Sequence, residues 1–419
     1  MVKFIKSKTI SVLRWSEQYT KTDMVYFASG NFWLNGSRVL SVGNGMLLTF
    51  AFANLLTPDM FGTYKYVLAT AGFIGSFALG GLGGAIGRSV AQGNSDVVPG
   101  VFRVSTLWST PASGVALAIS IYYFIQGNAI LGTGLALIAF TNLFGNSFGL
   151  YKNVILGRGD FKTYALYNIP NTLITSVTML VTVFLTKNIS IIIASYFISN
   201  FFTGWLIYTM TAKKYGIKRN DTSLQETVTY GKHLSLMGFI SQVSNNVDQL
   251  LLWHFAGPVQ LATYAFALAP IREIRNFSET IHPLIFPKYV TKTVSEIKQT
   301  MRMRVFQLGS VSFLVALVYI LIAPLFFHLV FPQYTGAIVL SQILALALIL
   351  QPKGIMETVL YSQGNTKLRY TTILVTNSSK VVAWIVLIPL YGVIGAVVGI
   401  ILGDIVSALI LWWAYKKIT

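Results

Sequence analysis

The sequence predicts an all-α, polytopic membrane protein with twelve transmembrane helices in two six-helix lobes, arranged as parallel repeats around a central cavity. The first observation is composition: 54% of the residues are hydrophobic, 11% are charged and the mean hydropathy is +0.64, whereas soluble domains carry about 25% charged residues. The second is a series of apolar spans separated by short polar turns, each long enough to form a membrane helix. The third is the one-sided distribution of the basic residues.

The apolar spans follow one another closely, and their ends are defined to about 3 residues. The longest polar break lies at residues 213–232, between the sixth span and the seventh. We therefore expect an N-terminal lobe at 1–212, a cytoplasmic linker at 213–233 and a C-terminal lobe at 234–419. In chain order the spans are 28–55, 61–84, 101–125, 130–150, 164–185, 189–211, 234–255, 261–286, 304–328, 337–360, 370–390 and 393–415.

The two predicted lobes repeat parts of one sequence. Six helices per lobe is an even number, so both repeats have the same orientation in the membrane. Parallel repeats of this kind are a transporter plan, with the substrate site between the halves. The identities at an offset of 200 include Pro58/Pro258, Thr63/Thr263, Tyr64/Tyr264 and Leu68/Leu268, and those at an offset of 205 are Gly159/Gly364 and Lys162/Lys367.

The basic residues predict the topology. With a cytoplasmic N-terminus, 24 of the 31 lysines and arginines lie in cytoplasmic segments, one (Lys187) lies in the opposite loops and six lie within spans. Such a bias is a strong positive-inside signal, and an even number of spans then places both termini in the cytoplasm. The concentration of basic residues in cytoplasmic segments also explains most of the net charge of +18. Because membrane topology accounts for this charge, we expect no nucleic-acid partner.

The first residues, 1–23, are basic but lack the apolar run of about 7–15 residues that a signal peptide needs. We expect this segment to lie against anionic lipid headgroups at the membrane surface. Membrane lipids are therefore expected partners.

Residues 245–290 form the most unusual stretch of the chain. A turn at Gly257-Pro258 is expected to join two membrane helices, and the second helix carries charges within apolar sequence. Four of its ionisable residues share one helical face because they recur at i, i+3, i+7 and i+10. These residues are Arg272, Arg275, Glu279 and His282.

The cationic part of this face points to an anionic cargo. Arg272 lies near the middle of a span of about 20 residues. A charge there costs at least about 2.5–3.5 kcal/mol on insertion scales, so the side chain should face a wet or protein-lined interior. The alternative is that Arg272, Glu273, Arg275 and Glu279 neutralise one another and only hold helices together.

Two further polar positions lie in other spans. Arg38 shares the first span with Asn31 and Asn35, and it either belongs to a polar face or extends to the cytoplasmic interface. Asp248 follows Asn245 in the seventh span. It could serve a coupling cation, but hydrogen bonding between helices is the more common use of such a residue.

Charged residues in the last three spans predict two ion pairs. Lys353 and Glu357 are separated by four residues, just after Pro352, where a kink is expected. We expect them to pair locally. Lys380 and Asp404 each lie about ten residues deep in adjacent antiparallel helices, and we expect an ion pair between these helices.

Several functional classes find no support in the sequence. Without cysteine there is no disulfide or thiolate metal site, and the four histidines show no metal-ligand spacing. The glycines between Gly80 and Gly87 lack nucleotide-loop spacing and instead fit close packing of small residues in a membrane. No Walker sequence or nucleophile elbow is present. We therefore expect no enzyme, no catalytic residues, no metal and no cofactor.

Four stretches in this order resemble the Wzx-type O-antigen and polysaccharide flippases, a polysaccharide transporter family of the multidrug/oligosaccharidyl-lipid/polysaccharide exporter superfamily. The similarity extends over nearly the whole chain. The stretches read ANLLTPDMFGTYKYVLATAGFIGSFALGGLGGAIGRSVAQG, GRGDFK, NNVDQLLLWHFAGPVQLATYAFA and QGNTK.

This resemblance implies two six-helix lobes around a cationic cavity. It implies movement of an undecaprenyl-diphosphate-linked oligosaccharide from the cytoplasmic to the periplasmic leaflet of a bacterial inner membrane. It also implies a polysaccharide polymerase and a chain-length regulator as partners. The similar lipid II flippases usually have fourteen spans.

The physics of phosphate binding agrees with this implication, because arginine donates charge-assisted, bidentate hydrogen bonds to phosphate oxygens. Two other classes stay open: a cation-coupled exporter of amphipathic drugs, and a scaffold that transports nothing. The expected diphosphate ligands are Arg38, Arg272, Arg275, Lys353 and Lys380, and the expected coupling or gating residues are Asp248, Glu279, His282 and Asp404.

Overall fold

The computed structural model describes residues 14, 24–217, 224–279, 294–362 and 366–418, and these residues form helices and short connections without a strand. The all-α prediction is confirmed. The helices are α2 (Met24–Leu55), α3 (Pro58–Ser76), α4 (Leu82–Ala91), η1 (Ser95–Val97), α5 (Val98–Ile125), α6 (Ala129–Phe148), α7 (Tyr151–Gly157), α8 (Phe161–Leu185), α9 (Ile189–Lys214), α10 (Leu224–Glu279), α12 (Val294–Val330), η2 (Pro332–Tyr334), α13 (Ala337–Ala345), η3 (Leu346–Leu350), α14 (Lys353–Ser362) and α15 (Thr366–Ile418).

The predicted spans coincide with helical segments, and two long helices each contain two of them. α10 turns back at Gly257, whose φ is 84°, and α15 turns back at Gly392, whose φ is 55°. Glycine is favoured at both turns because positive φ strains other residues. The bend expected at Pro352 is also present, with 45° between 337–350 and α14. The end of the eighth span, beyond Glu279, lies outside the described residues.

The predicted span 61–84 is interrupted. It breaks between α3 and α4, where Gly80 and Gly81 lower the helix propensity. The span 130–150 coincides with α6, and the shorter α7 follows after Gly149. Among the described residues, six helices are long and apolar enough to cross a membrane, or seven when the bent pair at 337–360 counts as one span; one of the six contains both arms of α15. The chain is a multi-pass membrane protein.

The chain divides into two compact units that differ from the predicted lobes. The first unit comprises Met1–Thr49 and Ala78–Ser235, and the second comprises Phe50–Phe77 and Leu236–Thr419. The boundary at residue 235 lies within α10 rather than in a linker, because the part of 213–233 that is described is largely helical. The segment 50–77 joins the second unit, whereas the sequence assigns it to the N-terminal lobe.

Close packing between α3 and α10 explains why residues 50–77 belong to the second unit. The ring of Tyr66 stacks on Trp253 with 4.0 Å between centroids, and Phe61 stacks on Phe266 at 4.4 Å. A Cβ added at Gly62 would lie 1.9 Å from the carbonyl oxygen of Pro258. The absence of a side chain therefore lets the two backbones touch.

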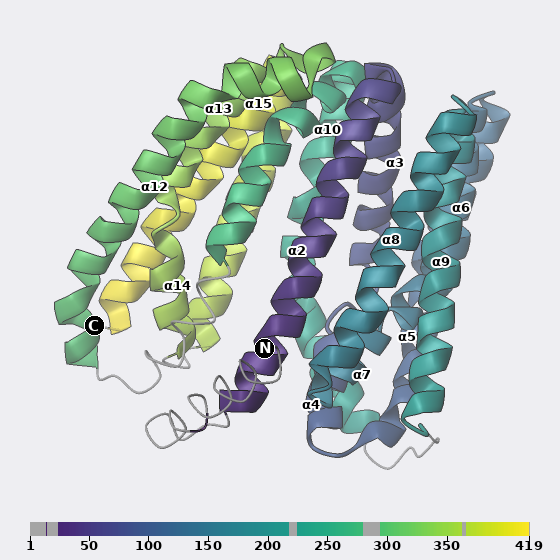
Figure 1. Cartoon of the computed structure of the whole chain (residues 1–419), viewed down its shortest axis with the longest axis horizontal. Helices are drawn as coiled ribbons and strands as arrows, with labels where there is room; N and C mark the ends of the chain where they lie inside the picture. The colour runs from purple at the N-terminus through teal and green to yellow at the C-terminus, as the bar shows by residue number, and fades with distance from the viewer. Residues whose placement is uncertain (1–13, 15–23, 218–223, 280–293, 363–365, 419) are drawn as a thin grey trace, which may run out of the picture. The chain divides into compact units, whose positions relative to one another are not determined.

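The rest of the second unit is built from α12 to α15. The segment formed by α13 and η3 contacts both α12 and α15, and α14 packs on α15. Figure 1 shows these helices in green to yellow, with the two arms of α15 running back and forth. The arms approach closely at Gly395, where an added Cβ would lie 2.1 Å from the carbonyl oxygen of Leu387.

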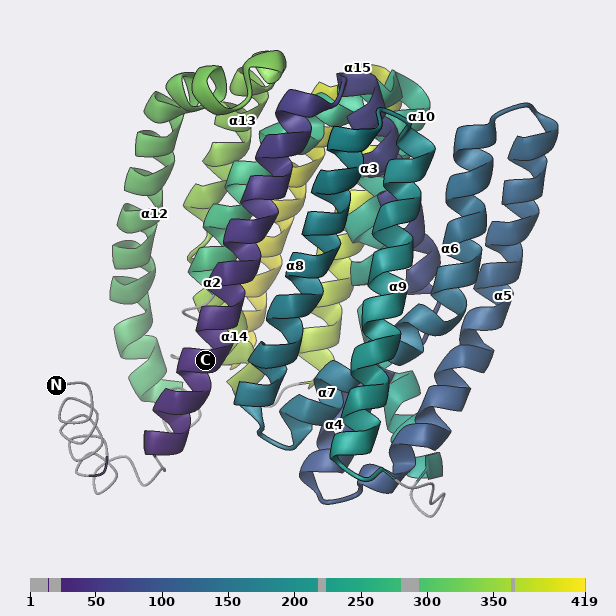
Figure 2. The ribbon, with the colours of Figure 1, turned by 45° about the vertical axis from the view of Figure 1, so that its right-hand side comes forward.

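The first unit is a bundle in which α5 packs on α6, α6 on α9 and α9 on α8. Figure 2 shows these four helices side by side. α2 is tied to α8 by polar side chains: Asn44 donates to the Ser176 hydroxyl at 2.6 Å, and Asn168 donates to the Ser37 hydroxyl at 3.1 Å.

The predicted packing of small residues near Gly80–Gly87 is confirmed. α4 lies against α7, and a Cβ at Gly157 would be 2.5 Å from the Gly87 carbonyl oxygen. A Cβ at Gly81 would be 2.3 Å from the Ser235 backbone nitrogen. These glycines serve helix contact rather than nucleotide binding.

The Asp160 carboxylate joins the start of α8 to the end of α9 in the first unit. Asp160 caps α8: its Oδ1 accepts from the Thr163 N–H at 3.0 Å, and its Oδ2 accepts from Lys214 and from the Tyr215 hydroxyl, both at 2.9 Å. Burial raises the pKa of the Asp160 carboxyl, but the hydrogen bonds from Lys214, Thr163 and Tyr215 outweigh it and hold the pKa below its ordinary value.

Replacing Asp160 by asparagine should lower stability in a pH-dependent way. Asparagine caps a helix as well as aspartate does, so the variant loses the ion pair and keeps the cap. Because the pKa of Asp160 is depressed on folding, its contribution is present above the unfolded pKa of about 3.9 and is lost as the pH falls through the folded pKa. Thermal unfolding should therefore show a deficit at pH 7 that shrinks below about pH 4. A deficit that stays constant with pH would contradict this role.

Candidate functional site

A cavity of about 540 Å³ in the second unit brings the predicted arginines together with residues from α15. The second arm of α10 supplies Arg272 and Arg275, one turn apart, as the helical spacing predicts. The first arm of α15 supplies Lys380 and Trp384. The other lining residues are Ser244, Asn245, Asp248, Leu268, Asn276 and Ile400.

Three cations converge on one carboxylate beside this cavity. Asp404, on the second arm of α15, is 3% exposed. Its Oδ2 accepts from the Arg275 guanidinium at 2.6 Å, and its Oδ1 accepts from Lys353 at 2.9 Å and lies 3.4 Å from the Lys380 ammonium. We call these four residues the Asp404 cluster. Three positive charges and one negative charge leave it with a net charge of +2.

The predicted ion pair between Lys380 and Asp404 is therefore present, but it is one part of a larger cluster. Lys353, which the sequence pairs with Glu357, binds Asp404. The chain bends by 45° just before α14, which begins at Lys353. The Lys353 ammonium group contacts Asp404 on α15.

The remaining cations around the cavity add to its positive charge. Arg272 is exposed and lines the cavity. Lys65, on α3, lies close enough to Arg272 for their positive charges to repel each other. The Nε of Arg275 is buried and has no hydrogen-bond partner among the described residues. A buried donor without an acceptor costs about 1–3 kcal/mol, so an incoming acceptor would be stabilised there.

Asp248 joins the two arms of α10. Its Oδ2 accepts a hydrogen bond from the Tyr264 hydroxyl at 2.5 Å across the turn at Gly257. The interpretation as a hydrogen bond between helices is thus confirmed. Asp248 is also buried and lines the cavity, and its Oδ1 has no partner among the described residues.

The other predicted site residues lie elsewhere or cannot be placed. Arg38 belongs to the first unit, where it is exposed on α2. Glu279 is the last residue of α10, and His282 lies outside the described residues.

Two glycines on the second arm of α15, which no sequence motif indicates as site residues, pack against Lys380 and Trp384 of the cavity. A Cβ at Gly403 would lie 2.1 Å from Cγ of Lys380, and a Cβ at Gly399 would lie 2.4 Å from the Trp384 ring. The Trp384 indole donates to the Ala396 carbonyl at 3.1 Å. The spacing of Gly395, Gly399 and Gly403 is the small-xxx-small pattern of close helix pairs, and this signal could have identified the contact.

Replacing Gly403 by alanine should displace Lys380 and weaken the site. The added Cβ would lie 2.1 Å from Cγ, 2.7 Å from Cε and 2.9 Å from Cδ of Lys380, so the lysine side chain must leave the position in which it lies 3.4 Å from Asp404. We expect transport to fall by roughly tenfold, the equivalent of about 1.4 kcal/mol, with a smaller change in thermal stability. Gly309→Ala is the matched control, because its Cβ would meet only Pro352 Cγ at 3.8 Å. Normal transport by Gly403→Ala would show that Lys380 needs no fixed position.

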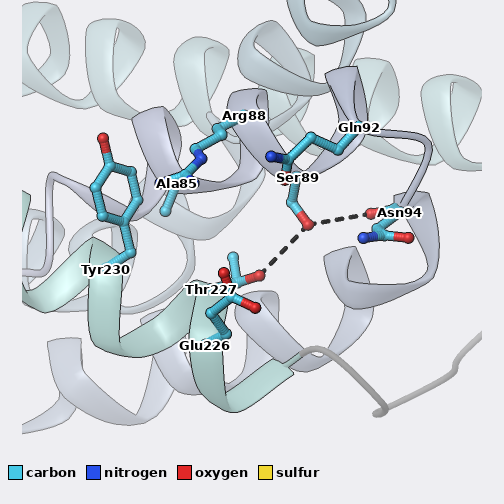
Figure 3. A pocket seen from close by; sticks show the side chains of 8 residues that line it. All are labelled: Ala85, Arg88, Ser89, Gln92, Asn94, Glu226, Thr227 and Tyr230. Carbon is cyan, nitrogen blue, oxygen red and sulfur yellow. Dashed lines mark hydrogen bonds between the residues drawn. The ribbon is translucent and has the colours of Figure 1, made fainter.

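A second pocket, in the first unit, is too small for a headgroup. It measures about 30 Å³ and lies between α4 and the start of α10. Figure 3 shows Ser89 between Thr227 and Asn94, with hydrogen bonds of 3.4 Å to each. Arg88 lies over the Tyr230 ring at 4.8 Å. A volume of this size holds about one or two waters. Because Arg88 of α4 lies over a ring of α10, it acts as a contact between these helices.

The arrangement in the second unit can bind an anion. The described residues contain no group of three or more side chains suited to a metal ion. Charge-assisted donors from α10, α14 and α15 instead converge beside one cavity. Arginine and lysine in such an arrangement recognise carboxylates and phosphates.

Comparison with known proteins identifies the family and the fold. The family model described as "Polysaccharide biosynthesis protein" matches residues 51–332. Among curated protein sequences, none matches this chain.

Several solved structures share the fold at low sequence identity. The lipid II flippase MurJ in an inward closed conformation is 13% identical, with a TM-score of 0.69 over 92% of this chain and 89% of that one. A multidrug resistance MATE family transporter of the MOP superfamily, in an outward-facing conformation, is 15% identical, with a TM-score of 0.59 over 93% and 95%. A MOP superfamily transporter from Pyrococcus furiosus, described by the reverse polarity of its binding pocket, is 15% identical, with a TM-score of 0.56 over 93% and 95%. The chain therefore shares the fold of these solved transporters and of the flippase.

Proposed function

Because the chain belongs to the polysaccharide biosynthesis protein family, we propose that it flips an undecaprenyl-diphosphate-linked oligosaccharide from the cytoplasmic to the periplasmic leaflet. The oligosaccharide would be an O-antigen unit or another surface-polysaccharide repeat unit. The membrane would be the bacterial inner membrane, with both termini in the cytoplasm.

The observation that carries this proposal is the positive charge beside the cavity of the second unit. The Asp404 cluster has a net charge of +2, and a diphosphate diester carries about two negative charges. A headgroup with that charge cannot enter hydrocarbon alone, since burying an unpaired charge costs many kcal/mol. Cations in a protein-lined cavity offset this cost.

The proposed roles follow from the position of each side chain. Arg272 is exposed in the cavity and would meet the diphosphate first. Arg275 would donate its buried Nε–H to a phosphate oxygen, while Lys353 and Lys380 would supply further charge. Arg38 remains a predicted ligand on α2. Glu279 and His282 remain predicted gating residues.

Transport would proceed by alternating access, in which the cavity opens first to one side of the membrane and then to the other. A surface-polysaccharide polymerase and a chain-length regulator would be the functional partners, as the family resemblance implies.

The rival function is cation-coupled export of amphipathic drugs, which the buried Asp248 carboxyl in the cavity favours. Reconstituted vesicles separate the two. With a fluorescent undecaprenyl-diphosphate oligosaccharide inside, the proposal expects the sugar to become accessible to an external reagent. Efflux of an amphipathic cation under a proton or sodium gradient, without movement of the lipid-linked sugar, would show that the protein is a drug exporter.

A further inference from the structure

Asp404 forms ion pairs with cations that line the cavity. Its side chain is almost fully buried, and each carboxylate oxygen accepts from at least one cation. Two of the cations in its cluster, Arg275 and Lys380, also line the cavity. Carboxylate and phosphate oxygens both accept charge-assisted hydrogen bonds from such donors.

We propose that Asp404 is an internal counter-ion that competes with the diphosphate for Arg275 and Lys380; this rests on the proposed function. In the empty site Asp404 holds both cations. The arriving diphosphate takes them over, and Asp404 recaptures them when the substrate leaves. The carboxylate therefore sets the balance between binding and release.

The electrostatics of the cluster explain why such a counter-ion is needed. Three cations around one point repel one another in a low-dielectric interior, and the Asp404 carboxylate offsets this repulsion in the empty site. A single carboxylate satisfies them only in part, because the Arg275 Nε–H has no acceptor among the described residues. A diphosphate offers more oxygens and one more negative charge, so it can displace Asp404.

A residue that only positions the cations would behave differently from one that competes. If Asp404 competes, Asp404→Asn should bind inorganic pyrophosphate about tenfold more tightly than the wild type, the equivalent of about 1.4 kcal/mol. In vesicles, both the half-saturating concentration and the maximal rate for lipid-linked oligosaccharide should fall, because release becomes slow. If Asp404 only positions the cations, removing its charge disperses them and the affinity falls.

Asp96→Asn is the matched control. Asp96 is exposed on η1 and lies outside the cavity, and its replacement removes the same charge. Its affinity for pyrophosphate should equal that of the wild type. An equal gain in both variants would overturn the proposal, since net charge alone would then explain it.

A second pair of variants covers the case in which the isolated Asp404→Asn protein does not fold. Lys353→Met removes one cation, and the double variant Lys353→Met/Asp404→Asn leaves two cations without the carboxylate. The double variant should bind pyrophosphate more tightly than Lys353→Met. Equal or weaker binding would overturn the proposal.

The outcomes also separate this inference from the proposed function. Pyrophosphate binding by the wild type, with no gain when Asp404 is replaced in either background, would overturn the inference and leave the flippase proposal standing. Absence of pyrophosphate binding in the wild type and in every Asp404 variant would overturn both.

Discussion

Replacing Arg272 by alanine should lower export of the lipid-linked oligosaccharide by roughly 10- to 100-fold while leaving the protein in the membrane. Arg272 is exposed in the cavity, and no ion pair of the Asp404 cluster includes it. Its loss therefore removes a substrate contact without breaking a buried pair. A hydrogen bond to a charged group contributes about 1.5–3 kcal/mol, which corresponds to roughly 10- to 100-fold in transport.

The measurement is the amount of surface polysaccharide in cells that depend on this chain, together with the amount of protein in their membranes. Arg272→Lys keeps the charge but loses bidentate geometry, so it should retain part of the activity. Arg103→Ala is the matched control, because Arg103 is exposed at the start of α5 and outside the cavity. Full export by a well-expressed Arg272→Ala protein would remove Arg272 from the site.

Replacing Gly62 by alanine should destabilise the second unit, and by more than Gly403→Ala does. The new Cβ would lie 1.9 Å from the Pro258 carbonyl oxygen, which is backbone and cannot rotate away. Overpacking costs about 1–3 kcal/mol and occasionally more, which exceeds the gain of about 1 kcal/mol from replacing glycine in a helix. α3 would have to move away from α10, and the stacking of Tyr66 on Trp253 would be disturbed.

Thermal unfolding of the purified protein in detergent measures this effect. Gly238→Ala provides the control in the same unit, since a Cβ there meets nothing within 4 Å; it should unfold at or above the wild-type temperature. A Gly62→Ala protein as stable as Gly238→Ala would mean that α3 and α10 do not touch as described.

Features that depend on neighbouring residues could be predicted from the sequence. The turn at Gly257-Pro258 follows from turn chemistry, and Arg272 and Arg275 share a face because helical spacing requires it. The ion pair of Lys380 with Asp404 follows from two opposite charges at equal depth. The all-α membrane fold follows from composition and span length.

Features that depend on how separate helices meet could not be predicted. Lys353 and Arg275 reach Asp404 from α14 and α10, and no spacing along the chain indicates that convergence. From the sequence, Glu357 is the expected partner of Lys353 because it is the nearest acid along the helix, and the contact with Asp404 is not expected. Residues 50–77 belong to the second unit because Gly62, which has no side chain, lets α3 contact α10 closely. The periodicity of apolar residues does not indicate such a contact.

The most direct test of the central claim compares two lipid-linked oligosaccharides that differ only in the linkage, one diphosphate and one monophosphate. Both are titrated against the purified wild-type protein at fixed ionic strength. The positive charge around Arg272 and the Asp404 cluster predicts at least about tenfold tighter binding of the diphosphate lipid, and this preference should weaken as salt is added. Equal affinity for the two lipids, unchanged by salt, would contradict the claim that these cations bind the diphosphate.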